Sequence, residues 1–516
     1  MSGRWTAALA GVAAGAVTLA VAEIGAAVML RGGMSSGTAS PLLAVGGAFV
    51  DRTPAWLKDL AIRTFGTHDK LALFIGMGVV LTCLCAVLGV LAARTGARSL
   101  AALAFAAVGV LGLLAVLDRP GASWPDVLPT VVGTAAGLVV LLRLTRSATG
   151  EEPSAPVAAG AASRRAVLAW GGGLTVVGAL GIVAGRALSR AGEVVEAARA
   201  RLGTLRVAAP VRVPEGASQG VPGQTAYLTP NDRFYRIDTA LSVPQVDPDT
   251  WRLRVTGMVE REVELTFQDL LDAELVEALV TLTCVSNVVG GNLAGNAIWT
   301  GLPVRDLLAR AGVRDGADMV LSTSTDGFTA GTPLEAMTDE RNALVAIAQN
   351  GEALLPEHGF PARLVVPGLY GYVSATKWVT ELKVTRFDQD EGYWTPRGWS
   401  ALGPIKTASR IDVPRPGDPV TAGEVVIAGV AWAQHRGIEK VEVRIGDAPW
   451  QEATLAEEPT IDSWRQWMLP WTAEPGEYAV SVRATDGAGE VQTQEHAYPA
   501  PNGASGWHTV DIRVDG

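Results

Sequence analysis

The sequence predicts a multi-domain protein in which an N-terminal α-helical membrane bundle precedes an α+β domain and a C-terminal all-β sandwich. The first observation is composition: 48% of the 516 residues are hydrophobic and 18% are charged, against about 25% charged residues in soluble proteins. The second is charge. Residues 1–190 hold 15 Lys and Arg against 8 Asp and Glu, a net charge of +7, and the remainder carries −17. The third is a change, after Gly403, to short alternating strands.

Five apolar stretches account for the predicted membrane bundle, because crossing a bilayer takes about 20 apolar residues. They occupy residues 7–30, 71–93, 100–117, 128–144 and 166–188. The fourth stretch is the shortest. Gly and Ala dominate these stretches, which suits close helix packing in lipid. We therefore expect a multi-pass membrane module over residues 1–190.

The positions of Lys and Arg predict its orientation, since short cytoplasmic loops are enriched in both. Basic residues gather between the second and third stretches and from the end of the fourth stretch to the start of the fifth: Arg94, Arg98, Arg143, Arg146, Arg164 and Arg165. If these loops are cytoplasmic, the body after residue 188 lies on the outer face of a bacterial cell membrane. The loop before Leu71 argues the other way, because its basic residues would then be external.

Arg164 and Arg165 stand directly before the last, Gly-rich apolar stretch. This arrangement resembles a twin-arginine export signal, placed internally in the chain. The alternative is ordinary flanking charge of a membrane segment. The export reading gains weight only if the exported body folds around a cofactor before it crosses.

The acidic half divides into a connector over residues 191–225, an α+β domain over 226–402 and a β-sandwich over 403–516. The connector opens with a helical run at 193–201. In the α+β domain we expect strands at 251–256, 279–284 and 363–366, and helices at 266–271 (capped by Thr266) and 303–312. In the sandwich we expect strands at 425–430, 440–445, 477–484 and 508–514.

Cys284 is the single cysteine after residue 190, so the predicted soluble body cannot form an internal disulfide. It follows a buried strand and precedes a Gly- and Asn-rich loop, a place where folds often put reactive groups. Three interpretations stay open at this point: a buried structural thiol, a thiolate metal ligand, and a nucleophile with a histidine base. The histidines available as a base are His358, His435, His496 and His508.

Several motifs with fixed spacing follow residue 228. They are Thr229-Pro-Asn-Asp-Arg-Phe-Tyr235, Leu282-Thr-Cys284-x-x-Asn287, Trp299-x-Gly-x-Pro303, Asn350-Gly-x-x-Leu-x-x-x-His358-Gly-Phe-Pro-x-Arg363-x-x-x-Pro-Gly368, and Lys377-Trp378. Together they resemble the sulfite oxidase family of molybdopterin enzymes, in which a catalytic domain precedes an immunoglobulin-like dimerisation domain. The resemblance covers somewhat over half of the chain and nothing in the membrane module.

The resemblance implies a molybdenum–molybdopterin cofactor, one molybdenum per chain, with Cys284 on the family's metal-binding cysteine. A soft thiolate suits a metal already held by sulfur ligands. Residues at the family's pterin-contacting positions are His358, Arg363 and Lys377, with Asn231, Tyr235 and Ser374 as further cofactor contacts. Tyr393 is close enough to the family's catalytic tyrosine, which aligns with Pro396, to replace it.

No haem, flavin or iron–sulfur motif is present, and His68 is the only histidine before His358. A membrane haem normally needs two histidines, so electrons are expected to pass to a quinone at the membrane module or to a separate cytochrome. The resemblance also implies a homodimer formed through the C-terminal domain. The acidic soluble half makes nucleic acid a poor partner.

The sequence departs from the sulfite pattern where substrate should bind. Where sulfite oxidases carry Arg-Asn-His, this chain reads Asp238-Thr239-Ala240, and two arginines after the cysteine turn are replaced by Val288 and Val289. Cations that would hold a dianion are therefore missing. We expect a membrane-anchored oxidoreductase that transfers an oxygen atom and two electrons to or from a substrate other than sulfite. The alternatives are a sulfite dehydrogenase-like enzyme and a cofactor-free surface-binding protein on the same fold.

Overall fold

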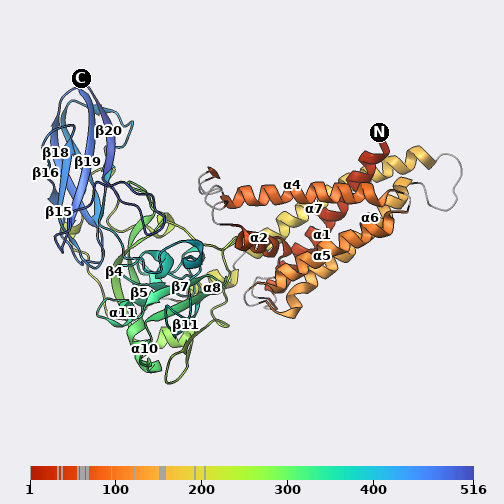
Figure 1. Ribbon diagram of the computed structural model, residues 1–516, viewed down its shortest axis with the longest axis horizontal. Helices are drawn as coiled ribbons and strands as arrows, with labels where there is room; N and C mark the ends of the chain where they lie inside the picture. Colours follow the sequence, from red (N-terminus) through yellow and green to blue (C-terminus); the bar gives the residue numbers. More distant parts are fainter. Residues whose placement is uncertain are drawn as a thin grey trace. The chain divides into compact units, whose positions relative to one another are not determined.

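The computed structural model describes two compact units, one formed by Met1–Glu193 with Ala240–Gln245 and the other by Val194–Thr239 with Val246–Gly516 (Figure 1). The residues that it describes are 2–31, 34–35, 39–54, 57, 64–65, 69–94, 96–119, 122–149, 159–190, 193–202 and 205–516. The predicted boundaries at residues 190, 225 and 402 are finer than this division and stay predictions.

The first unit is helical. Its helices are α1 (Ser2–Arg31), α2 (Pro41–Arg52), α4 (Asp69–Ala92), α5 (Arg98–Leu117), α6 (Leu128–Thr149) and α7 (Ala159–Arg190), with a short 3₁₀ helix at Trp124–Val127. Four stretches are long and apolar enough to cross a membrane: Arg4–Leu30, Lys70–Ala92, Arg98–Leu117 and Trp124–Arg146. They match the first four predicted segments. The fifth lies in α7, where Ala169–Gly185 is a shorter apolar helix among the residues described. The side chains of Arg164 and Arg165, and all of His68, lie outside the described residues.

Small residues let these helices approach closely. Gly11 of α1 lies against the backbone of Cys85 and Gly89 in α4, so that a methyl group at Gly11 or Gly89 would overlap the facing helix. Outward-facing side chains such as Leu71, Val79 and Leu111 are more than half exposed. Close backbone contact inside and apolar side chains outside are typical of helices packed in lipid, and are compatible with a transmembrane anchor.

The α+β region of the second unit is built on two sheets. One has the order β1-β4-β5-β8-β10 with β9 paired to β8, and the other has the order β3-β2-β11-β6-β7. Their strands are β1 (Val207–Ala209), β2 (Arg252–Gly257), β3 (Val263–Thr266), β4 (Leu275–Thr283), β5 (Ala294–Pro303), β6 (Met319–Ser324), β7 (Thr329–Pro333), β8 (Leu344–Gln349), β9 (Glu352–Ala353), β10 (Arg363–Val365) and β11 (Val379–Thr385). Helices α8 (Glu193–Arg201), α9 (Phe267–Asp272), α10 (Val304–Ala311) and α11 (Glu335–Thr338) complete it.

The region after residue 403 is β-rich, as predicted. Its two sheets have the orders β12-β14-β18-β17 and β13-β20-β19-β15-β16, and one apolar cluster that includes Ile427, Val441 and Trp467 fills its core. The strands are β12 (Ala408–Val413), β13 (Val420–Thr421), β14 (Gly423–Trp432), β15 (Ile438–Ile445), β16 (Gln451–Glu452), β17 (Thr454–Leu455), β18 (Arg465–Ala473), β19 (Gly476–Asp486) and β20 (His508–Asp515).

Most local expectations hold, and two differ. The Thr266 hydroxyl caps α9 by accepting from the Asp269 N–H, and α10 ends at Gly312 with a φ of 71°, a backbone angle that favours glycine. The predicted strand 279–284 starts earlier and ends at Thr283, which leaves Cys284 in the following loop. The connector, predicted without a strand, contributes β1, which pairs in parallel with β4.

Candidate functional site

Cys284 opens a closed loop between β4 and β5. Its N–H donates to the Leu293 carbonyl over 2.9 Å, and its own carbonyl accepts from the Asn287 N–H over 3.0 Å. The Asn287 side-chain oxygen accepts from the Leu293 N–H over 2.9 Å. These bonds fix the loop 284–293 as a unit. Burial raises the pKa of the Cys284 thiol, against hydrogen bonds from Ser286 that lower it, so ligation by a metal is what would keep it as a thiolate.

His358 lies at the end of a short 3₁₀ helix, Pro356–His358, directly before Gly359. Gly359 has a φ of 110°, and a Cβ there would lie 3.0 Å from the Arg363 Cβ and 3.1 Å from the Lys377 Cβ. Glycine is therefore required at this point of the motif, both for the backbone angle and for space. It allows the chain to bring His358, Arg363 and Lys377 together.

The His358 ring is buried and oriented from both sides. Its Nε2–H donates to the Asn231 carbonyl over 3.0 Å, and the ring packs against Phe234 with the centroids 5.7 Å apart and the planes at 75°. Burial, and secondarily the nearby Arg363 cation, lower the pKa of His358 to about 4. The imidazole is therefore neutral at pH 7. The backbone carbonyl of Asn231, and not its side chain, accepts the hydrogen bond that orients the ring.

Arg363 begins β10 and is 5% exposed. Its guanidinium donates to the His358 carbonyl over 3.1 Å and to the Leu364 carbonyl over 3.4 Å, and it lies 5.0 Å from the centre of the Trp299 ring. Burial lowers the pKa of Arg363 to about 10. Across residues 205–516, none of the ion pairs includes Arg363. A buried cation without a carboxylate is costly, and an anionic ligand would offset that cost.

Lys377 is buried beside Arg363 but has an acidic partner. Its ammonium donates to the Asp238 carboxylate over 2.8 Å and to the Glu357 carbonyl over 2.9 Å, and it lies 4.6 Å from the centre of the Trp378 ring. Burial lowers the pKa of Lys377 to about 8, and the Asp238 carboxylate opposes that shift. At pH 7 the ammonium is still mostly charged.

Asp238 stands where the sequence predicts a lack of cations, but two cations surround it in the structure. Its side chain is 3% exposed and pairs with Arg236, 2.9 Å away, as well as with Lys377. The carboxylate is thus enclosed between two cations. The absence of the family's arginine does not make this corner of the site negative.

Tyr235 connects the Cys284 loop to the cation cluster. Burial raises the pKa of Tyr235, a negative charge on Cys284 would raise it further, and the Arg363 cation lowers it, so Tyr235 lies near both of these groups. Tyr370 is a second tyrosine near the cysteine: burial and Cys284 raise its pKa to about 12. The sequence reasoning missed Tyr370, although it follows the matched Pro367-Gly368 pair by two residues.

The remaining predicted site residues have structural partners. Asn231 donates its amide to the Gln349 carbonyl and to Glu352, each over 3.1 Å. The Ser374 hydroxyl is fully buried and donates to the Leu369 and Tyr370 carbonyls, which shapes the turn that carries Tyr370. The Tyr393 ring packs against Phe328 and the Arg397 guanidinium. Cofactor contact by Asn231 and Ser374, and catalysis by Tyr393, stay predictions.

The donor set fits molybdopterin. Within the described part of the chain, no group of three or more His, Cys, Asp or Glu side chains could hold a metal ion. A metal at Cys284 would therefore take its other ligands from a bound group, as a dithiolene sulfur donor provides. The anionic phosphate of the same group matches the Arg363 cation.

Comparisons with known proteins agree with this arrangement. Residues 240–394 match the family model described as "Oxidoreductase molybdopterin binding domain". The fold and the site therefore define a molybdopterin-binding oxidoreductase. An uncharacterized oxidoreductase, YuiH, of Bacillus subtilis is 34% identical over 157 residues, which are 30% of this chain and 76% of that protein. The chain belongs to this family, the sulfite oxidase family.

Longer relatives are the mitochondrial sulfite oxidases. The rat enzyme is 31% identical over 342 residues and the human enzyme 31% over 343, in each case 56% of this chain and 62% of the relative. This chain thus spans about three fifths of the length of those relatives. Among solved structures, the sulfane dehydrogenase SoxCD of Paracoccus pantotrophus aligns with a TM-score of 0.50 and 25% identity, over 57% of this chain and 84% of that one.

Proposed function

We propose that this protein is a membrane-anchored molybdenum-cofactor oxidoreductase that acts on a small substrate outside the cytoplasm. The observation that carries the proposal is Arg363, a buried cation with carbonyl partners, next to Tyr235 and the Cys284 loop. The bound molybdenum cofactor would supply exchange of an oxygen atom and two electrons with the substrate.

The chain's own residues would bind and orient that group. Arg363 and Lys377 offer cations to its phosphate, and the neutral His358 ring adds a polar contact that Asn231 holds in place. Cys284 would give the thiolate ligand. Tyr235 and Tyr370 are protonated at neutral pH, as tyrosines ordinarily are, and burial raises the pKa of each further, so both could donate hydrogen bonds near the metal.

Metal analysis of the purified full chain tests this function. We expect about one molybdenum per chain and a fluorescent pterin released on denaturation. A folded preparation from molybdenum-supplied cells that holds neither would favour the cofactor-free surface-binding alternative.

For the substrate, we favour a neutral or cationic molecule, such as a sulfoxide or an N-oxide. Val288, 53% exposed in the Cys284 loop, and Val289 stand where sulfite oxidases carry arginines. Each charge-assisted hydrogen bond contributes about 1.5–3 kcal/mol, so losing two such contacts would weaken sulfite binding or turnover by about a hundredfold to ten-thousandfold or more.

A small sulfur anion is the second candidate substrate. The enclosed Asp238 favours it, because Arg236 and Lys377 together outweigh that one carboxylate. Steady-state kinetics with artificial electron donors and acceptors separates the two substrates. A kcat/KM for sulfite near 10⁶ M⁻¹s⁻¹, within the usual enzyme range of about 10⁴–10⁸ M⁻¹s⁻¹, would reject the neutral substrate.

The membrane anchor rests on the four apolar helices. We propose an outward-facing catalytic body, export through Arg164 and Arg165, electron exchange with a quinone or a separate cytochrome, and a dimer through the β-rich region as an immunoglobulin-like domain. Replacing Arg164 and Arg165 by lysine keeps the charge and removes the export signal. If this variant still places a molybdenum-loaded C-terminus outside, the two arginines are flanking charge.

A further inference from the structure

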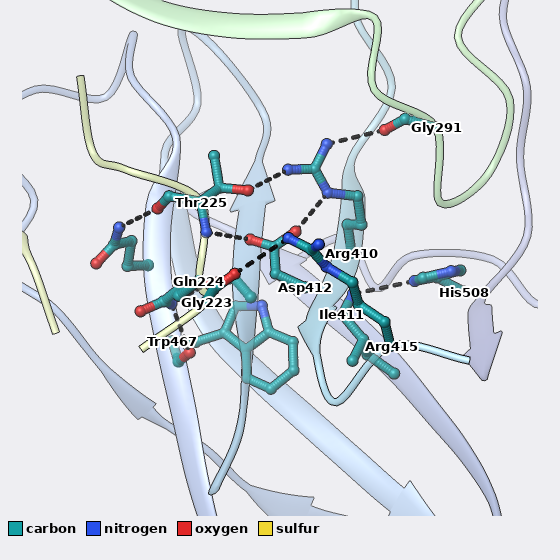
Figure 2. Close-up of polar contacts among 12 residues, drawn as sticks. Gly223, Gln224, Thr225, Gly291, Arg410, Ile411, Asp412, Arg415, Trp467 and His508 are labelled. Carbon is teal, nitrogen blue, oxygen red and sulfur yellow. Dashed lines mark hydrogen bonds and ion pairs between the residues drawn. The ribbon is translucent and has the colours of Figure 1, made fainter. Parts of the chain in front are cut away.

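Arg410 of β12 connects three separate segments of the second unit (Figure 2). Its Nε donates to the Asp412 carboxylate over 2.7 Å, its Nη1 to the Gly291 carbonyl over 2.8 Å and its Nη2 to the Thr225 hydroxyl over 2.9 Å. Asp412 in turn accepts from the Thr225 N–H over 3.1 Å. Arg410 and Asp412 are each 8% exposed. One buried guanidinium thus joins the β-rich region to the connector and to the Cys284 loop.

His508 holds the neighbouring residue of the same loop. Its Nδ1 accepts from the Ile411 N–H over 3.0 Å, beside Arg410 (Figure 2). The other side of the ring lies directly against Gly290, where any Cβ would overlap it, and Gly290 has a φ of 74°. Two consecutive loop residues are therefore fixed by two consecutive residues of β12, one through a side chain and one through His508.

The strand that leads into the loop is held from the same region. The Gln434 amide, fully buried, donates to the Thr281 carbonyl over 2.9 Å and to the Thr283 hydroxyl over 3.0 Å. The Trp464 N–H donates to the Thr281 hydroxyl over 2.7 Å. With β4 fixed on one side, the position of Cys284 depends on how firmly the far side of its loop is held.

We propose that Arg410 is a positioning residue for the metal site: it holds the loop 284–293 so that the Cys284 sulfur meets the metal in one geometry. This inference rests on the proposed function, because it assigns Cys284 the metal. Cys284 would be the single protein ligand, so the loop alone sets the direction of the sulfur. Partners that orient a metal ligand commonly affect metal affinity or activity by about 10- to 100-fold.

Arg410→Lys is the variant that tests it. Lysine keeps the positive charge for Asp412, but a single ammonium cannot reproduce the fork that reaches Gly291 and Thr225 together. Arg415→Ala is the matched control, because Arg415 lies on the following turn and donates to the Gly223 carbonyl over 3.4 Å, not to the loop (Figure 2). Thr225→Val removes one arm of the network and leaves the bond to Gly291.

Two measurements report on the loop apart from turnover. In full-length protein made without cofactor, alkylation of Cys284, followed by peptide mass spectrometry to separate it from Cys83 and Cys85, requires the loop to open. We expect it to be about tenfold faster in Arg410→Lys, because the loop loses a charge-assisted hydrogen bond that resists opening, and unchanged in Arg415→Ala and Thr225→Val. In loaded protein, the thiolate-to-metal charge-transfer absorption should shift in Arg410→Lys alone.

The inference would be overturned if a folded Arg410→Lys protein were alkylated at the wild-type rate and its charge-transfer absorption were unshifted. It would also be overturned if Arg415→Ala changed both measurements to the same extent. If Arg410→Lys does not fold, Gly290→Ala displaces the loop from its other contact and should give the same two changes. If the wild-type protein takes up no molybdenum, the proposed function fails, whereas the alkylation comparison still decides whether Arg410 holds the loop.

Discussion

Two buried arginines of the same unit meet opposite surroundings. Arg410 is 8% exposed and has a carboxylate 2.7 Å away, a hydroxyl and a carbonyl, one for each of its three nitrogens. Arg363 is 5% exposed and has two carbonyls and the face of Trp299. Arg410 thus has its charge and its hydrogen-bond donors matched within the protein. Arg363 has hydrogen-bond partners, but no carboxylate within residues 205–516 pairs with it.

The difference separates Arg410, a structural cation, from Arg363, the cation that we propose binds an anionic ligand. Burying a guanidinium costs several kcal/mol unless a charge of opposite sign accompanies it. Asp412 supplies that charge to Arg410, whereas no ion pair within residues 205–516 includes Arg363. Lys377 stands between these cases, since Asp238 neutralises it while burial still lowers its pKa to about 8. The site therefore has one full positive charge available for an anionic ligand, and a second that is shared.

The largest expected effect concerns Cys284, the residue that we propose as the metal ligand. We expect Cys284→Ser to fold and to retain pterin, because the cation cluster is intact, but to lose turnover by more than about a hundredfold, the upper range for mere partners of metal ligands. Pterin fluorescence and steady-state kinetics on one preparation measure both quantities. Full activity of the Cys284→Ser variant would contradict the proposal that Cys284 binds the metal.

The same substitution should change the free energy of unfolding very differently at the two arginines. In cofactor-free protein, Arg410→Met leaves Asp412 buried and unpaired and should lower the free energy of unfolding by about 3–5 kcal/mol. Arg363→Met removes an uncompensated charge and should leave the stability equal or higher, while abolishing cofactor retention. Denaturant unfolding of the two variants checks this. A large loss of stability in Arg363→Met would mean that the cation has a structural partner.

Acid stability extends the comparison to two histidines. Burial lowers the pKa of both His358 and His508 to about 4, whereas an unfolded histidine titrates near 6.5. Between about pH 6.5 and 4 the unfolded chain binds more protons, so stability falls as the pH falls. His358→Gln and His508→Gln should each flatten this fall in thermal-melt series. Only His358→Gln should also weaken cofactor retention.

The smallest effect concerns Lys377. The depressed pKa predicts that cofactor-free protein binds molybdopterin less well as the pH rises through about 8, by up to tenfold per pH unit. Asp238→Asn removes the carboxylate that opposes this depression, so the decline should begin at lower pH. Binding titrations from pH 6 to 9 measure the onset. An unchanged onset would show that Asp238 does not control the charge of Lys377.

The sequence predicts local features well, because their causes are local. Apolar length predicts the four membrane-length helices, Thr266 predicts its helix start, and Gly312 predicts a helix end. Within the motif from Asn350 to Gly368, His358 and Arg363 do lie together, since the Arg363 guanidinium donates to the His358 carbonyl; their contact with a cofactor stays a prediction.

What the sequence could not predict depends on contacts between distant residues. Arg410 and Gly291 are 119 positions apart, and Lys377 and Asp238 are 139 apart, with no periodic pattern to connect either pair. From the sequence alone, Asp238 predicts a negative charge at this part of the site. In the structure, Arg236 and Lys377 pair with its carboxylate and offset that charge. Arg410 lies outside the strands predicted for the C-terminal region, and no motif marks it.

The residues that contact the Cys284 loop are synthesised long after the loop itself. Gly291 cannot meet Arg410 until a further 119 residues have been added, about 6–24 s at bacterial or eukaryotic elongation rates of about 5–20 residues per second, and His508 is made later still. During that interval the cysteine is synthesised but its loop is unsupported. The loop therefore gains its full set of contacts only after the β-rich region has been translated, and truncation before β20 would remove the contact of Gly290 with His508.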